Sequence, residues 1–198
     1  MPVGSRGYLF YCNSAVIQIT NSGKVTEWQR EARAVNELEQ ILVGDAYAAP
    51  PSHILEGLSE ELVHRKPDGA PHSIYEELWH IAFWQRVTLD WINCRETPFP
   101  ASPADGFPTV QDMELENWPV LYRRFFQGAS EAVEATRDEE RLNKVVRCPS
   151  RPEMPVREMT VREQLENMGA HNAYHLGRIV LLRQLLGVWP PKAGGFSW

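Results

Sequence analysis

The spacing of apolar residues predicts a series of helices joined by loops that are rich in proline and glycine. At Thr26, Ser73 and Thr160, a threonine or serine is followed three residues later by glutamine or glutamate, which is the capping box that opens a helix. The predicted helices cover residues 26–43, 54–64, 74–93, 109–136 and 161–186. Four of them are long, and this predicts an all-α fold, a four-helix bundle.

The segments outside these helices have a different composition. Residues 1–25 place glycines and asparagines around a β-branched patch, which predicts an N-terminal arm or short strand before a bundle domain over residues 26–198. Residues 142–156 hold three prolines and predict an irregular or short extended connection. Pro119 either kinks the helix predicted over 109–136 or marks its true first turn.

The inward face of the last predicted helix carries the strongest chemical signal. This face is aliphatic except near its middle, where His171 and His175 lie four residues apart and about 40° from each other around the helix axis. Two imidazoles at this spacing can hold one metal ion, but a usable site needs at least a third ligand. His80 is the best candidate, because it lies on an inward stripe of the helix predicted over 74–93.

Two other interpretations of these histidines compete with a three-histidine metal site. Buried histidines are often ordinary core residues whose ring nitrogens are hydrogen-bonded. A di-iron carboxylate site is suggested by Glu77 and His80, which match the Glu-x-x-His motif, but such a site needs two motifs, and Met168 stands three residues before His171. We therefore expect Glu77 either to face solvent or to contact one of the metal-ligating histidines without binding the metal itself.

Several nearby residues have two readings each. Asn172 lies on the inner stripe and is a candidate contact for a ligand or a substrate, while Arg178 either receives an anionic substrate group or extends to solvent. The helical tryptophans either line an apolar pocket or form plain core: Trp84, Trp91 and Trp118. Three histidines near predicted loops or helix ends are not expected to be ligands: His53, His64 and His72.

Composition narrows the class of protein further. The 198 residues include 20 Lys and Arg against 26 Asp and Glu, so the net charge of −6 argues against nucleic acid or an anionic membrane as the main partner. Three scattered cysteines do not suggest a disulfide framework, and no run approaches the roughly 20 apolar residues of a membrane span. We therefore expect a cytoplasmic protein. A chain of this length can hold a core without a structural metal, so a bound metal is expected to be functional.

Two segments together resemble one known family. Ser73-Ile-Tyr-Glu-Glu-Leu-Trp-His80 and the segment from His171 to Gly187, which begins His-Asn-Ala-Tyr-His, are similar to the DinB/YfiT-like superfamily over about residues 27–190. The resemblance implies a four-helix bundle, often a homodimer, that binds a divalent ion through His80, His171 and His175. Zn, Ni, Fe and Mn all suit such a ligand set, and no organic cofactor is expected.

The resemblance also implies a choice of activities. The superfamily includes thiol-dependent transferases that use small thiols such as bacillithiol or mycothiol, and it includes metal-dependent hydrolases. A metal ion can lower the pKa of a bound thiol or of a bound water, so the ligands do not choose between the two reactions. We expect a small-molecule substrate and favour thiol transfer over hydrolysis. A non-catalytic bundle that binds a ligand or acts in stress is the alternative.

Overall fold

The structure is a computed structural model that describes residues 37–43, 49–151 and 153–192. The arm or strand predicted over residues 1–25 lies outside these residues. So does the first part of the helix predicted over 26–43, of which residues 37–43 are helical.

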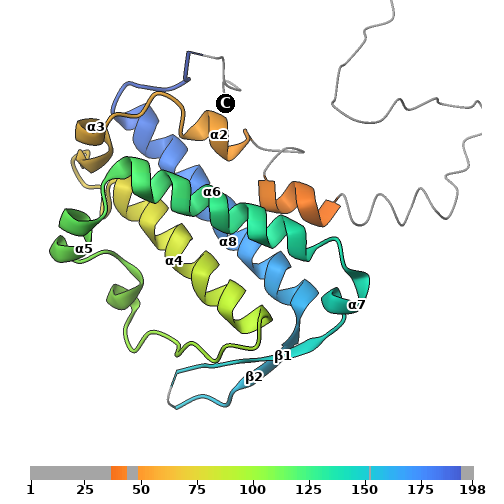
Figure 1. The fold of residues 1–198 in the computed structure, drawn as a ribbon. Coiled ribbons are helices and arrows are strands. Elements are labelled where there is room, and N and C mark those ends of the chain that lie inside the picture. The colour runs from red at the N-terminus through yellow and green to blue at the C-terminus, as the bar shows by residue number, and fades with distance from the viewer. Residues whose placement is uncertain (1–36, 44–48, 152, 193–198) are drawn as a thin grey trace, which may run out of the picture.

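Three long helices lie side by side and form the body of the fold (Figure 1). They are α4 (Ile74–Ile92), α6 (Trp118–Ala135) and α8 (Val161–Leu185). The helical residues 37–43 pack closely against α8, because a Cβ added to Gly169 would lie 2.3 Å from Ile41 Cγ2. The all-α bundle predicted from the sequence is confirmed.

Shorter elements connect these helices. They are α2 (Pro51–Ile54), α3 (Glu60–His64), the 3₁₀ helix η1 (Pro103–Gly106), α5 (Val110–Leu115), α7 (Glu139–Leu142), and the strands β1 (Val145–Cys148) and β2 (Arg157–Thr160). The strands pair antiparallel, with Val145 opposite Thr160 and Cys148 opposite Arg157. The sequence predicts that the connection over residues 142–156 is either irregular or extended. Because β1 lies within it at Val145–Cys148, the extended form is confirmed for these residues.

Two predicted helices are divided in the structure. The single helix predicted over 54–64 is wrong, because α2 and α3 are separated by a turn in which Gly57 has a φ of +68°. The helix predicted over 109–136 is likewise divided, into α5 and α6, and of the two roles predicted for Pro119 the one that marks the true first turn is confirmed. Asn117 caps α6 by accepting a hydrogen bond from the backbone N–H of Val120, and Pro119 occupies the first turn.

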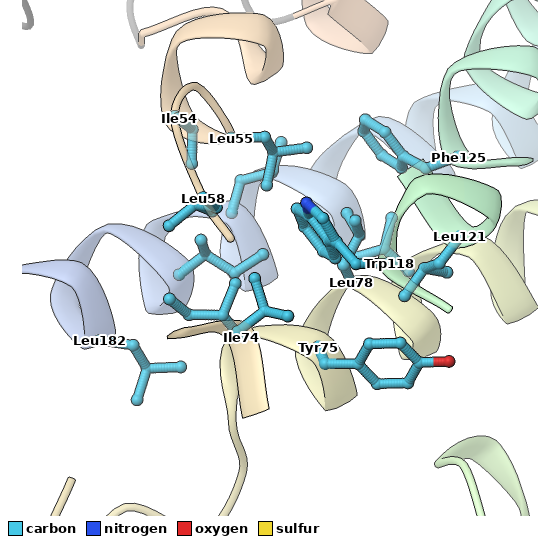
Figure 2. Packing of buried hydrophobic residues seen from close by; sticks show 14 of the residues in the cluster. Ile54, Leu55, Leu58, Ile74, Tyr75, Leu78, Trp118, Leu121, Phe125 and Leu182 are labelled. Atoms are coloured by element: carbon cyan, nitrogen blue, oxygen red, sulfur yellow. The ribbon is translucent and has the colours of Figure 1, made fainter. Parts of the chain in front are cut away.

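The core consists of two clusters of buried side chains. The first lies between α2, α4, α6 and α8 and includes Leu78, Leu121 and Trp118 (Figure 2), so Trp118 is a core residue. The second lies toward the hairpin and includes Trp91 and Leu165. The first cluster fixes α4 against α8, the two helices that carry the histidines of interest. Across the described residues, we find no helix with the length and apolar character needed to cross a membrane.

Candidate metal centre

The structure brings together the three histidines that the sequence proposes as ligands. His80 lies on α4, and His171 and His175 lie on α8. One potential ligand atom from each ring lies within 4.8 Å of the other two. The Nε2 atoms of His80 and His171 are 3.1 Å apart. This is the one such group of histidine, cysteine and carboxylate side chains found in the described part of the chain.

The outer nitrogens of two rings are held by hydrogen-bond acceptors. His80 Nδ1 lies 2.7 Å from the carbonyl oxygen of Gly106, and His175 Nδ1 lies 2.6 Å from Glu77 Oε2. A carbonyl and a carboxylate can only accept, so each Nδ1 carries the proton and donates. A neutral imidazole with a proton on Nδ1 has a free lone pair on Nε2, which is the form that ligates a metal.

The spacing of the rings fits a single divalent ion. Two nitrogens at about 2.0–2.1 Å from one ion are separated by roughly 3.0–3.4 Å when the angle between them is octahedral or tetrahedral. The 3.1 Å between the Nε2 atoms of His80 and His171 falls in this range. Because His80 Nδ1 already carries a proton and donates it to the Gly106 carbonyl, His80 Nε2 presents a lone pair to His171 Nε2. The two Nε2 atoms can lie this close if His171 carries its proton on Nε2 or if a cation lies between them.

Burial keeps the rings of His80 and His171 neutral near neutral pH. Desolvation lowers the pKa of His80 to about 4, and the hydrogen bond to the Gly106 carbonyl opposes this shift. Desolvation, with the charges of His175 and His80, lowers the pKa of His171 to about 4. Metal binding requires deprotonated imidazole, so both rings are prepared for it at neutral pH.

Glu77 contacts a candidate ligand from outside the three-histidine cluster. Its side chain is fully buried, so the solvated alternative is wrong. Oε2 accepts from His175, and Oε1 lies 2.8 Å from Arg178 Nη2. Arg178 therefore lies against a buried carboxylate and does not simply extend to solvent, and its role as the receiver of an anionic substrate group stays a prediction. The sequence offered a signal for this contact, since Glu77 lies one turn before His80 and Arg178 one turn after His175.

Aromatic rings surround the histidine cluster on the side of the loop that follows α4. Phe107 stacks on His80 with ring centroids 4.2 Å apart and on His72 at 3.9 Å. The ring of Trp84 lies 6.4 Å from His80 and 6.3 Å from His171, with an edge-on geometry in both cases. Trp84 therefore lines the site. His72 is separated from His80 by the ring of Phe107 and does not belong to the group of candidate ligands.

Asn172 lies on another face of α8. Its side chain is buried, and it lines an apolar cavity of about 300 Å³ between α8, α2 and the helical residues 37–43. Within the described residues, its Oδ1 makes no hydrogen bond of good geometry, but the Asn172 side chain interacts with His171 and opposes the lowering of the His171 pKa. The role of Asn172 as a ligand or substrate contact stays a prediction.

These observations define an all-α bundle with a buried group of three histidines at metal-ligand distance between two of its helices. The chain belongs to the DinB superfamily, whose family model matches residues 52–179 and so covers His80, His171 and His175. Comparison with curated proteins gives no match.

Proposed function

We propose that this protein is a metal-dependent DinB enzyme that transfers a group to a small thiol. The ion would be held by His80, His171 and His175. The observation that carries the proposal is the 3.1 Å separation of the His80 and His171 Nε2 atoms, in rings that burial keeps neutral. Ion identity is left open among Zn, Ni, Fe and Mn, which all accept imidazole ligands.

The chemistry follows from the charge of the ligands. A divalent ion held by His80, His171 and His175 would keep its full charge, because imidazole ligands carry none, and it would supply the acidity that turns a thiol into a thiolate. This thiolate would attack an electrophilic centre of the second substrate, and the leaving group would depart with the electrons of the broken bond and take up the proton that the thiol released.

The residues around the cluster support a partly apolar substrate. Phe107 and Trp84 cover His80 with aromatic rings, and a water-poor wall strengthens the electrostatic effect of a bound ion. Glu77 and the Gly106 carbonyl fix the orientation of two of the rings. In this proposal the chain supplies orientation and exclusion of water, and the bound ion supplies charge.

Metal analysis of protein purified without an affinity tag tests the site. We expect about one equivalent of Zn, Ni, Fe or Mn, and we expect this metal to be lost in His171→Ala. The control is His64→Ala, which removes an exposed histidine paired with Glu60 on α3. Absence of metal after incubation with all four ions would refute the proposal.

The reaction is tested separately with metal-loaded protein. A panel of small thiols should raise the melting temperature, and the thiol that binds should support turnover of an electrophile. If no thiol binds but an ester or amide is hydrolysed, the protein is a hydrolase instead. If neither thiols bind nor any substrate turns over, the non-catalytic alternative is favoured.

We also propose that the protein works as a cytoplasmic homodimer. Tyr174, Leu181 and Leu185 leave about 54–64% of their surface exposed on one side of α8, and exposed apolar side chains grouped in this way favour an interaction surface. Cys94 and Cys148 are free thiols among the described residues, as is usual in a reducing compartment. Sedimentation analysis of wild type and Leu181→Glu tests the dimer, since the variant should be monomeric.

A further inference from the structure

Arg178 forms an ion pair with Glu77, and neither residue is one of the three candidate metal ligands. It lies one turn beyond His175 on α8, and its guanidinium Nη2 lies 2.8 Å from Glu77 Oε1. About 30% of the Arg178 side chain is exposed, whereas none of the Glu77 side chain is. The guanidinium carbon also lies 5.9 Å from the ring centre of Tyr174, one turn earlier on α8. Arg178 therefore reaches inward from the rim of the site to a buried carboxylate.

The two oxygens of Glu77 are divided between two partners. Oε2 accepts from His175 Nδ1 at 2.6 Å, and Oε1 faces Arg178. A carboxylate held at both oxygens cannot rotate about its terminal bond without losing one of these contacts. A buried carboxylate without a cationic partner is strongly unfavourable, so Arg178 also makes it possible to bury Glu77 beside His175.

We infer that Arg178 is a positioning residue that fixes Glu77 as the acceptor of His175 Nδ1 and thereby presents His175 Nε2 to the metal. The inference rests on the proposed three-histidine site. In this role Arg178 acts through Glu77 and touches neither the ion nor the substrate. The competing role is direct binding of an anionic substrate or anion at the metal, in which Arg178 would act independently of Glu77.

A double-variant cycle separates these roles. The measurement is the affinity of the tag-free protein for Co²⁺, by competition with a chelator, together with the visible absorption spectrum of bound Co²⁺. The variants are Glu77→Gln, Arg178→Met and the two combined. Loss of a group that orients a metal ligand weakens affinity by about 10–100-fold, and we expect this range for Glu77→Gln and about tenfold for Arg178→Met.

The combined variant decides the mechanism. If Arg178 acts through Glu77, the combined variant binds Co²⁺ as weakly as Glu77→Gln alone and has the same spectrum. Arg178→Lys keeps the charge and should recover part of the affinity, which also covers the case in which Arg178→Met does not fold. The control is Arg124→Gln, which removes an equally short ion pair, that of Arg124 with Glu116 at 2.7 Å, and should leave Co²⁺ affinity unchanged.

Three results would overturn the inference. They are wild-type affinity and spectrum in folded Arg178→Met, losses that add in the combined variant, and an equal loss in Arg124→Gln. In each of these cases wild type still binds Co²⁺ and His171→Ala does not, so the proposed metal site survives. If wild type itself binds no Co²⁺, both the site and the role of Arg178 are refuted.

Discussion

Gly106→Ala should weaken metal binding without breaking the fold. Gly106 ends η1, and its carbonyl oxygen accepts the hydrogen bond of His80 Nδ1 at 2.7 Å. A Cβ at this position would lie 3.3 Å from His80 Nδ1, 3.4 Å from His80 Cε1 and 3.5 Å from Trp84 Nε1. Ordinary contacts of this kind are about 3.5–4.0 Å, so the methyl group is short of space by a few tenths of an ångström. The backbone φ of Gly106 is not in the left-handed region, and the substitution therefore acts through this crowding alone.

The size of the effect follows from which group can move. Stacking on Phe107 at 4.2 Å restrains the His80 ring, so we expect the loop to shift and the Nδ1–O distance to lengthen to about 3 Å. Complete loss of such an outer hydrogen bond weakens metal affinity by about 10–100-fold. The lengthened bond should weaken affinity by about 3–10-fold.

A chelator competition assay with Zn²⁺ or Co²⁺ measures this change, and Gly177→Ala is the matched control. Nothing lies within 4 Å of a Cβ added to Gly177, which is inside α8. That variant should keep wild-type affinity and raise the free energy of unfolding by about 0.5–1 kcal/mol, as glycine is a poor helix former. Wild-type affinity in Gly106→Ala, or an equal loss in both variants, would refute the reasoning.

Three further predictions concern stability, each measured as the free energy of unfolding in urea. Unfolded imidazoles bind protons near pH 6.5, whereas His80 and His171 in the metal-free fold resist protonation until about pH 4. Stability should therefore fall as the pH drops from 6.5 to 4, by up to about 3 kcal/mol per ring, and a flat profile would contradict this. Arg183→Met should cost about 2–4 kcal/mol, because buried Arg183 donates to backbone carbonyls of α2 and of the chain after α8. An unchanged stability would show that these bonds are replaced by water. Tyr75→Phe should cost about 1–2 kcal/mol by removing the hydroxyl that donates to the Glu116 carbonyl, and a gain in stability would contradict this.

The first residues of two long helices, α4 and α8, could be predicted because capping side chains mark them in the sequence. Ser73 and Thr160 each accept a hydrogen bond from the third helical residue, whose glutamate bonds back, so α4 and α8 begin where the sequence indicates. Thr109 forms the same box with Asp112, and the helix predicted from residue 109 does begin there. Pro119 indicated the start of α6 but left a kink as the alternative, because apolar residues continue from α5 into α6 and only the cap at Asn117 decides between the two.

The histidine cluster could be predicted, but its supports could only be predicted in part. His171 and His175 share a helix face at any rotation of α8, and His80 is the histidine among the buried residues of α4. The support of His80 is a backbone carbonyl, that of Gly106, which leaves no side-chain signal in the sequence. It depends on how the loop after α4 returns to the bundle, and that path follows from the stacking of Phe107 on His80 and His72.

Glu77 shows how one motif can have two meanings. Residues three apart share a helix face, so Glu-x-x-His places Glu77 and His80 toward the neighbouring helix, but what the carboxylate does depends on what lies opposite. The pairs His80 with His171 and Glu77 with His175 and Arg178 show that α4 and α8 run antiparallel, since moving back along α4 corresponds to moving forward along α8. In a di-iron bundle a second carboxylate motif faces the first. Here a histidine donates to one oxygen of the carboxylate, and an arginine three residues later forms an ion pair with the other. An arginine at this spacing on the facing helix therefore favours an orienting carboxylate over a ligand, and the Co²⁺ spectrum of Glu77→Gln tests this reading directly.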